Sequence, residues 1–519
     1  MSLQEWFLTA EERGNPDTSL DRRHPDGCAW TKGNEVRVLV HGAEYFRELL
    51  ARVREMSSGD LLLFTDWRGD PDERLDGPGS EVGKVFADAA HRGVDVRGLV
   101  WRSHLDRFQF SEQENRHLAE EIEAAGGECL MDMRVRPGGS HHQKLVVLRH
   151  PSRPASDIAF IGGIDLCHSR RDDAEHAGDP QSQPMSAPYG DRPPWHDAQV
   201  AIQGPAVGDA ETVFRERWND PAPVSRNPLY VFGDEMHRDD RHPNQLPPQL
   251  PDPLPAGKHA TQLLRTYPVR RPGYPFAKRG ERSIERAYRK VWGKAESLVY
   301  LEDQYLWSTQ VADVFAAALR RSPRLRLIVV IPRFPDQLGR VATPGNLVGR
   351  ELAMERLLDA GGDRVGIYSI ENRQGVPIYV HAKVCVVDDV WATVGSDNAN
   401  RRSWTHDSEL SCAVLDPTSE TSFARNLRMQ LAREHLGRPG GENDDLLDHK
   451  GMFDAFARSA AQLDAWHRSG KLGTRPPGQL RKYWHAPLTR WQRMWSRPLY
   501  QAFFDPDGRT PLMKYRKEV

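Results

Sequence analysis

The sequence predicts an α/β protein built from two similar lobes, each a mixed β-sheet flanked by helices. Short apolar runs of strand length alternate with amphipathic segments of helix length, which is typical of α/β sheets. The same ordered set of features occurs twice along the chain. Between the copies, residues 241–258 contain six prolines in 18 residues, too many for a packed helix or an inner strand. We interpret this stretch as a linker.

The expected elements follow from composition and period. Strands are expected at residues 61–65, 94–101, 145–148, 158–161, 298–301, 325–331, 384–387 and 410–415. Amphipathic helices are expected at residues 80–91, 112–125, 283–295, 311–321 and 349–360. The chain then divides into an N-terminal extension (1–35), a first lobe (36–240), the proline-rich linker (241–258), a second lobe (259–437) and a C-terminal extension (438–519).

Composition narrows the class of protein. Of 519 residues, 38% are apolar and 28% are charged, as in a folded globular chain. The net charge of −2 makes a nucleic-acid partner unlikely, because such proteins usually present many cations. Apolar runs fall short of the ~20 residues of a membrane span, and the start lacks a secretory signal. Five scattered cysteines without a CxxC pair fit a reducing cytoplasm. We expect a cytoplasmic monomer.

The residues most suited to catalysis lie in the two copies of the repeat. In the first copy, His142 lies 76 residues after Asp66, and in the second copy His381 lies 78 residues after Asp303. Each histidine begins a His-x-Lys sequence that opens an apolar strand. Each strand leads to a glycine turn, GGID (162–165) or GSDN (395–398). Four features recurring in the same order at nearly equal spacing indicate a duplication.

The His-x-Lys pairs allow three interpretations. On a strand, residues i and i+2 share a face, so each pair presents an imidazole and an ammonium together. A metal site is disfavoured because lysine is no ligand and would repel the cation. Two unrelated solvated pairs would not explain the repeated context. A phosphodiester site uses every group, since two lysines neutralise phosphate oxygens while one histidine attacks and the other protonates the leaving oxygen.

With these motifs the chain resembles the phospholipase D superfamily, whose signature is HxKxxxxD followed by a GSxN-type turn. HAKVCVVD (381–388) with GSDN matches in full, and HHQKLVVLR (141–149) matches except at its last position. Further segments resemble plant-type and animal-type phospholipases D and their bacterial relatives, among them FTDW (64–67), GGIDLCHSRRD (162–172), PWHD (194–197) and HDSEL (406–410). The resemblance covers roughly residues 60–415 and implies two phospholipase-D-type lobes that share one active site.

The resemblance also implies roles. His142 would be the nucleophile that forms a phosphohistidine, and His381 would be the general acid and then base. Lys144, Lys383 and Asn398 would hold the phosphate oxygens. Glu409 would orient His381 and Asp172 would orient His142, since each imidazole needs a carboxylate partner. The remaining expected members are Ser396, which would assist through its hydroxyl, Gly163 and Asp165 in place of the family's Ser and Asn, His141 near the headgroup, and Asp388 as a structural member.

The expected function is phospholipase D activity, which releases phosphatidic acid and a free headgroup, with transfer to an alcohol acceptor as a further reaction. A nuclease or other phosphodiesterase of the same superfamily is the alternative. A second alternative is a non-catalytic lipid-binding relative, because Arg149 stands where the first motif of the family has Asp. No cofactor or metal is expected. The region 465–498 holds eight basic and no acidic residues with four tryptophans, a composition that favours a peripheral position at the inner membrane face.

Overall fold

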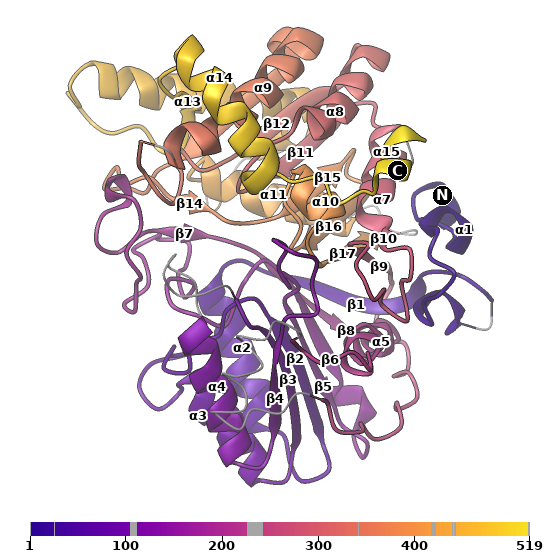
Figure 1. Cartoon of the computed structure of the whole chain (residues 1–519). Helices are drawn as coiled ribbons and strands as arrows, with labels where there is room; N and C mark the ends of the chain where they lie inside the picture. Colours follow the sequence, from indigo (N-terminus) through magenta and orange to yellow (C-terminus); the bar gives the residue numbers. More distant parts are fainter. Residues whose placement is uncertain are drawn as a thin grey trace.

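The computed structural model describes residues 2–24, 26–103, 112–225, 242–340, 342–416, 422–438, 440 and 443–516. One 16-stranded sheet runs through the molecule in the order β4-β3-β2-β5-β6-β8-β1-β9-β17-β16-β15-β11-β12-β13-β18, with β10 paired to β9. In Figure 1 the first lobe lies below and the second above, and β1 and β9 meet between them. The strands β1 and β9 are antiparallel, so the two lobes share one continuous sheet.

The strands of the first lobe are β1 (Thr31–Leu39), β2 (Leu61–Asp66), β3 (Asp95–Trp101), β4 (Glu128–Asp132), β5 (Leu145–Arg149), β6 (Ile158–Gly162), β7 (Trp195–His196) and β8 (Gln199–Gln203). Those that follow are β9 (His259–Tyr267), β10 (Glu281–Arg282), β11 (Leu298–Glu302), β12 (Arg326–Val330), β13 (Val365–Ile370), β14 (Tyr379–Val380), β15 (Val384–Val387), β16 (Trp391–Gly395), β17 (Glu409–Leu415) and β18 (Leu480–Lys482).

The α-helices of the first half are α1 (Ala10–Arg13), α2 (Gly42–Arg54), α3 (Val82–His91), α4 (Glu112–Ala124) and α5 (Ala206–Trp218). Those of the second half are α7 (Ser283–Trp292), α8 (Thr309–Arg321), α9 (Ala342–Gly361), α10 (Arg401–Thr405), α11 (Phe423–His435), α12 (Asp444–Leu447), α13 (His449–Arg468), α14 (Arg490–Leu499) and α15 (Pro511–Tyr515), with a π-helix at Tyr500–Phe504 between the last two.

The predicted duplication is confirmed by the strand order. The series β1-β8-β6-β5-β2-β3-β4 of the first lobe repeats as β9-β17-β16-β15-β11-β12-β13 in the second. In both series the first five strands pair antiparallel and the last three pair parallel. The fold is therefore a large mixed sheet flanked by helices, as the sequence predicts.

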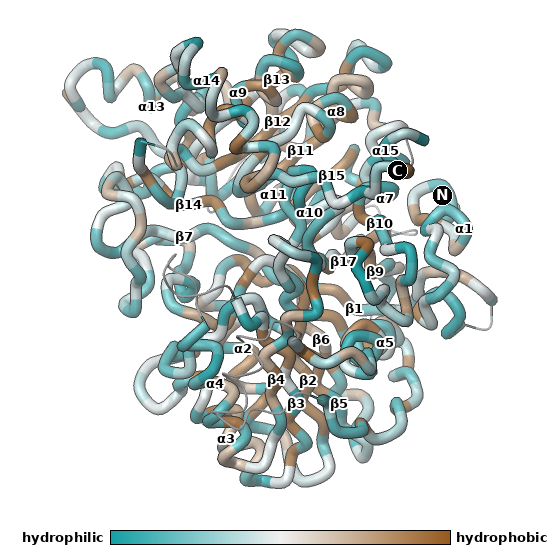
Figure 2. Tube along the Cα trace, viewed as in Figure 1, coloured by the Kyte–Doolittle hydropathy of each residue, from teal (hydrophilic) through white to brown (hydrophobic). Residues whose placement is uncertain are grey.

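The sheet is the apolar centre of the molecule, and the hydropathy view shows brown strands under paler helices (Figure 2). One apolar cluster runs through both lobes, which shows that they are packed against each other and not merely linked. Val147 of β5 and Val386 of β15, each in the strand that a His-x-Lys opens, both belong to this cluster. Burying such side chains contributes about 1.5–3 kcal/mol each, so the strands that carry the motifs are firmly held.

The terminal extensions are less separate than predicted. The expected boundary at residue 35 falls inside β1, and Phe7 and Leu8 pack into a core cluster of the second lobe. At the other end, β18 pairs with β13 and extends the sheet of the second lobe. Residues 242–258 of the predicted linker contain no helix or strand. Among the described helices, none is both long and apolar enough to cross a membrane.

Candidate active site

The two His-x-Lys sequences lie at equivalent places, immediately before the central strands β5 and β15. In each, the backbone pairs with the opposite lobe. The amide of His142 donates to the carbonyl of Ser408 at 2.9 Å, and the amide of His381 donates to the carbonyl of His196 at 2.8 Å. The motifs are thus fixed where the lobes meet.

The imidazole of each His-x-Lys motif, His142 or His381, has a carboxylate partner from the other lobe. Nδ1 of His142 lies 2.9 Å from Oε2 of Glu409, and Nδ1 of His381 lies 2.6 Å from Oδ2 of Asp197. A carboxylate can only accept from Nδ1–H, which leaves Nε2 of each neutral ring with its lone pair. The predicted pairing within lobes is wrong, because Glu409 serves His142 and not His381, and Asp172 serves neither.

The crossed pairing follows from the duplicated sheet. Gly162 of β6 is in register with Gln199 of β8, and Gly395 of β16 is in register with Ser411 of β17. Asp197 and Glu409 each stand two residues before those partners. The two carboxylates are therefore equivalent members of the repeat, and each reaches across to the other lobe's histidine.

The lysines lie against their own motifs. Nζ of Lys144 donates to the carbonyl of His142 at 3.0 Å and lies 3.2 Å from Oδ1 of Asp165. Nζ of Lys383 donates to the carbonyl of His381 and lies 3.3 Å from Oε1 of Gln304. Both ammonium groups are almost completely buried. They form a positive site that is matched to a phosphodiester anion.

Burial and charge set the protonation of the cluster. The pKa of His142 and that of His381 lie well below the ordinary value because both rings are buried and both face Lys144 and Lys383. Burial lowers the pKa of Lys383 to about 8, with Lys144 adding to the effect. Burial also raises the pKa of Glu409 to about 8, helped by the nearby Asp407 carboxylate. Neutral imidazoles beside ammonium groups suit nucleophilic attack on an anion.

Comparisons with known proteins agree with this geometry. Residues 71–312 match the family model described as Phospholipase D, and residues 292–431 match the one described as Cardiolipin synthase, PLD-like domain. The chain belongs to the phospholipase D superfamily. Phospholipase D alpha 1 of Cynara cardunculus is 25% identical over 85% of this chain and 68% of its own length.

Other relatives are longer than the matched region. Phospholipase D1 of Schizosaccharomyces pombe is 26% identical over 74% of this chain, which spans 34% of that protein. Phospholipase D alpha 1 of Arabidopsis thaliana is 25% identical over 70% of this chain, which spans 60% of it. Among solved structures, phosphatidylserine synthase of Haemophilus influenzae Rd KW20 matches with a TM-score of 0.51 at 11% identity, over 84% of this chain and 94% of that one. This last likeness concerns the fold.

The superfamily's glycine turns both lie beside the carboxylates. Oγ of Ser396 donates to Oε2 of Glu409 at 2.5 Å, so this predicted phosphate-assisting hydroxyl instead braces the carboxylate. Asn398 is buried and its Oδ1 has no hydrogen-bond partner. Gly163 is the first-lobe residue that corresponds to Ser396, and a Cβ on it would lie 2.3 Å from Oδ1 of Asp197. Glycine thus leaves room there for the carboxylate.

Four further residues singled out in the sequence lie away from the two imidazole–carboxylate pairs or face elsewhere. His141 is fully buried beside Asp132, so it is not placed to touch a headgroup. Asp172 accepts from the amides of Trp195 and Asp173 and braces a loop. The last two are Asp388, which accepts from the amides of residues 296–298, and Arg149, which is buried between Asp157 and Glu211. Asp388 thus holds the backbone ahead of β11, and Arg149 is paired away from the two histidines.

Asp165 and Asp197 take roles that differ from those predicted from the sequence. Asp165, expected to contact substrate, forms an ion pair with Lys144 and so sets the lysine's position. Asp197 was part of a recognised segment, PWHD, but received no role. Its signal was its position ahead of a strand that pairs with the glycine-turn strand, which only the register reveals.

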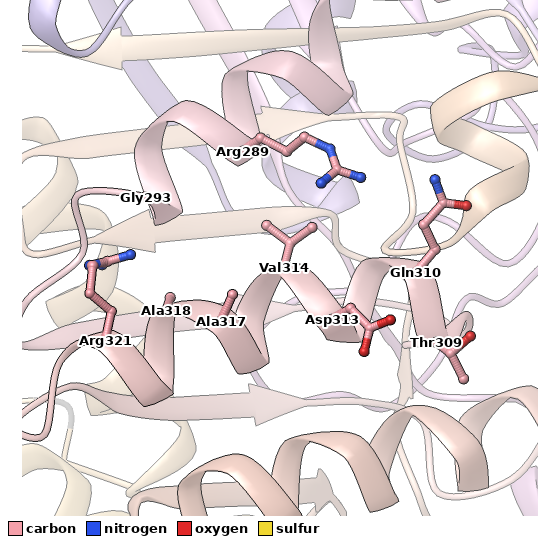
Figure 3. A pocket seen from close by; sticks show the side chains of 9 residues that line it. All are labelled: Arg289, Gly293, Thr309, Gln310, Asp313, Val314, Ala317, Ala318 and Arg321. Carbon is pink, nitrogen blue, oxygen red and sulfur yellow. The ribbon is translucent and has the colours of Figure 1, made fainter. Parts of the chain in front are cut away.

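A surface depression elsewhere lacks these groups. Figure 3 shows the depression of about 480 Å³ between α7 and α8, lined by Arg289, Gln310, Asp313 and neighbouring residues. None of the lining residues belongs to a His-x-Lys segment or to a glycine turn. We assign this depression no part in the superfamily's chemistry.

Proposed function

We propose that the protein is a phospholipase D that hydrolyses glycerophospholipids to phosphatidic acid and a free headgroup. The observation that carries the proposal is the pair of crossed dyads, His142 with Glu409 and His381 with Asp197, each beside a buried lysine. Two equivalent imidazoles around one positive site suit a double displacement at phosphorus. One ring can hold the phosphatidyl group while the other moves protons.

In the first displacement, Nε2 of His142 attacks phosphorus. The new bond joins nitrogen to phosphorus, and the bond from phosphorus to the headgroup oxygen breaks. The bound phosphodiester anion offsets the lysine charges that, together with burial, keep His381 neutral in the absence of substrate, so that His381 is protonated in the complex. It gives the proton on Nε2 to that oxygen, and the headgroup leaves as an alcohol. Lys144 and Lys383 neutralise the nonbridging oxygens, with Asn398 as a further amide donor.

In the second displacement, neutral His381 takes a proton from water while the water oxygen attacks phosphorus. The bond between phosphorus and His142 breaks, phosphatidic acid leaves, and His381 is again protonated. An alcohol in place of water would give a new phosphatidyl ester by the same steps. The lysines provide the positive charge that these steps need.

The C-terminal region supports a membrane-surface substrate. Trp484, Trp491 and Met494 are each more than 60% exposed, and Arg490 and Arg497 of α14 are also exposed. Exposed tryptophan with arginine is the composition that binds headgroup phosphates and the interfacial layer. We propose that this surface brings the enzyme to its substrate as a peripheral membrane protein.

Incubation with phosphatidylcholine vesicles and ethanol tests the activity. Phosphatidic acid and phosphatidylethanol should both form, and the His142→Asn variant should form neither. If no headgroup is released from phosphatidylcholine, phosphatidylethanolamine or phosphatidylglycerol, the proposal is wrong. Cleavage of single-stranded DNA without lipid turnover would instead assign the same dyads to a nuclease.

A further inference from the structure

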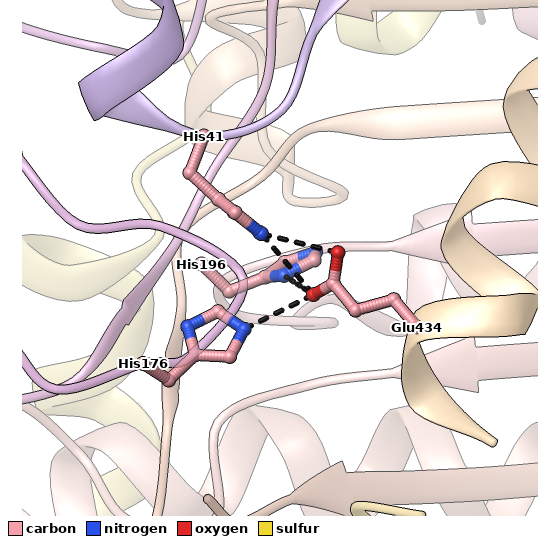
Figure 4. A group of neighbouring side chains, drawn as sticks. All are labelled: His41, His176, His196 and Glu434. Atoms are coloured by element: carbon pink, nitrogen blue, oxygen red, sulfur yellow. Dashed lines mark hydrogen bonds and ion pairs between the residues drawn. The ribbon is translucent and has the colours of Figure 1, made fainter. Parts of the chain in front are cut away.

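Three histidines and a glutamate meet where the two lobes touch, away from the proposed nucleophile. His41 directly precedes α2, His176 lies in the loop before β7, His196 lies in β7, and Glu434 lies near the end of α11. One potential ligand atom of each lies within 4.8 Å of the others. Figure 4 shows the three rings converging on the Glu434 carboxylate. Three ligands come from the first lobe and one from the second.

The spacing of these atoms suits a tetrahedral ion. From Oε1 of Glu434, the distance is 3.1 Å to Nε2 of His41, 3.0 Å to Nε2 of His176 and 3.5 Å to Nδ1 of His196. A tetrahedron with zinc–nitrogen bonds of about 2.0–2.1 Å has edges of about 3.3–3.4 Å. The three distances from Glu434 are therefore within about 0.4 Å of tetrahedral edges, and the ring nitrogens lie within 4.8 Å of one another, close enough to be drawn around one zinc ion.

Hydrogen bonds on the far sides of two of the rings also favour a bound cation. Nδ1 of His176 lies 3.0 Å from the carbonyl of Trp195, which can only accept, so Nδ1 carries the hydrogen. Nε2 of His196 lies 2.6 Å from the Glu302 carboxylate and likewise donates. In their neutral forms both rings then turn a lone pair toward the negative Glu434. Such an arrangement is repulsive unless positive charge stands between them.

We propose that His41, His176, His196 and Glu434 bind one structural zinc ion. Imidazole and carboxylate ligands suit zinc, and four protein ligands leave no open position for a reacting water. The three rings are almost completely buried, and the Glu434 side chain is 13% exposed. The bonds from His176 to a carbonyl and from His196 to a carboxylate match the outer-shell partners that orient ligating histidines.

The neighbouring group of His196, Glu302 and His435 is an outer shell of this site and not a second ion. Its distances of 2.6 Å and 2.7 Å are hydrogen-bond lengths, shorter than a tetrahedral edge. The Tyr300 hydroxyl also donates to Glu302. Glu302 thus holds the ring of His196 in the orientation that presents Nδ1.

The proposed ion would act as a clamp between the lobes and would position the active site. The carbonyl of His196 accepts from the amides of His381 and Ala382 at 2.8 Å and 3.1 Å. The next residue, Asp197, holds the His381 ring. Fixing His196 therefore fixes both the backbone and the carboxylate that orient His381.

Metal content tests the proposal directly. The full-length protein, expressed with added zinc and dialysed, should contain one zinc per chain by mass spectrometry. Cobalt(II), exchanged into the protein, should give the intense visible absorption of a tetrahedral centre. His41→Gln and Glu434→Gln each remove a ligand, so each should weaken zinc binding by more than the roughly 10–100-fold that the loss of an outer-shell partner costs. The matched control, His467→Gln, removes a histidine that pairs with Glu371 elsewhere and should keep full zinc content.

The competing arrangement is a metal-free cluster held by protons. Burial lowers the pKa of both rings, but the neighbouring carboxylates outweigh it and raise the pKa to about 9 for His176 and about 10 for His196. Such a cluster would bind neither zinc nor cobalt, and its melting temperature would not respond to EDTA. That result, or equal zinc content in the wild type and both ligand variants, would overturn the proposal. If the variants fail to fold, the wild-type cobalt spectrum and EDTA response still decide.

Discussion

Replacing Asp197 by Asn separates the crossed arrangement from one in which each lobe supplies its own carboxylate. In the structure, Oδ2 of Asp197 lies 2.6 Å from Nδ1 of His381, with the side chains 0% and 6% exposed. The asparagine amide can donate to Nδ1, which would move the ring hydrogen to Nε2. His381 would then lack the lone pair that activates water, and the imidazolium would lose its counter-charge.

The size of the effect follows from burial. Removing one partner of a buried charged pair costs about 3–5 kcal/mol. At 1.36 kcal/mol per factor of ten, Asp197→Asn should lower kcat by about 10²–10⁴-fold. The control is Asp172→Asn, since Asp172 contacts backbone amides and lies 3.8 Å from His176 but touches neither His142 nor His381, and its loss should be less than about tenfold on the same scale.

A chromogenic phosphodiester with a p-nitrophenol leaving group shows which half-reaction fails. Nitrophenol leaves without a proton, so Asp197→Asn should still release a burst of one equivalent and then stall as phosphohistidine. Glu409→Gln should abolish the burst, because Glu409 orients the nucleophile. If Asp197→Asn retains wild-type turnover, or if Asp172→Asn is the more damaging change, the crossed assignment is wrong.

Three other outcomes are expected. The plot of kcat/KM against pH for the wild type should be a narrow bell centred near pH 8, because activity requires deprotonated Glu409 and protonated Lys383, both with a pKa of about 8. A flat profile from pH 6 to 10 would contradict this. Gly163→Ala should lower kcat while leaving the melting temperature nearly unchanged, since its Cβ would lie 2.3 Å from Oδ1 of Asp197 and displace that carboxylate. An unchanged kcat with a lower melting temperature would show that Gly163 matters for packing alone. Replacing Arg490 and Arg497 by Gln should weaken binding to anionic vesicles at low salt by about 2 kcal/mol, or roughly 30-fold, as measured by sedimentation. Unchanged binding would show that α14 does not contact the membrane.

Much of the fold could be predicted from the sequence. All eight expected strands and four of the five expected helices coincide with observed elements within three residues, and the fifth expected helix (349–360) is the C-terminal part of α9, which begins seven residues earlier at Ala342. Those segments were found because apolar period is a local property of the chain. The strands β1 and β9 were not predicted, although they join the lobes. Their residues, such as Asn34 and Gln262, are polar groups buried by partners more than 200 residues away.

The sequence by itself determined the duplication, the two His-x-Lys pairs and the glycine turns, because each is a short pattern whose chemistry depends on adjacent residues. Tertiary structure decided which carboxylate serves which imidazole. It also placed Arg149 between Asp157 and Glu211 and brought His41, His176 and His196 around Glu434. The physical reason is the same in each case. Hydrogen bonds and ion pairs act over about 3 Å in space, and the groups that meet here belong to separate elements of the fold, which for the two dyads and the histidine cluster come from different lobes.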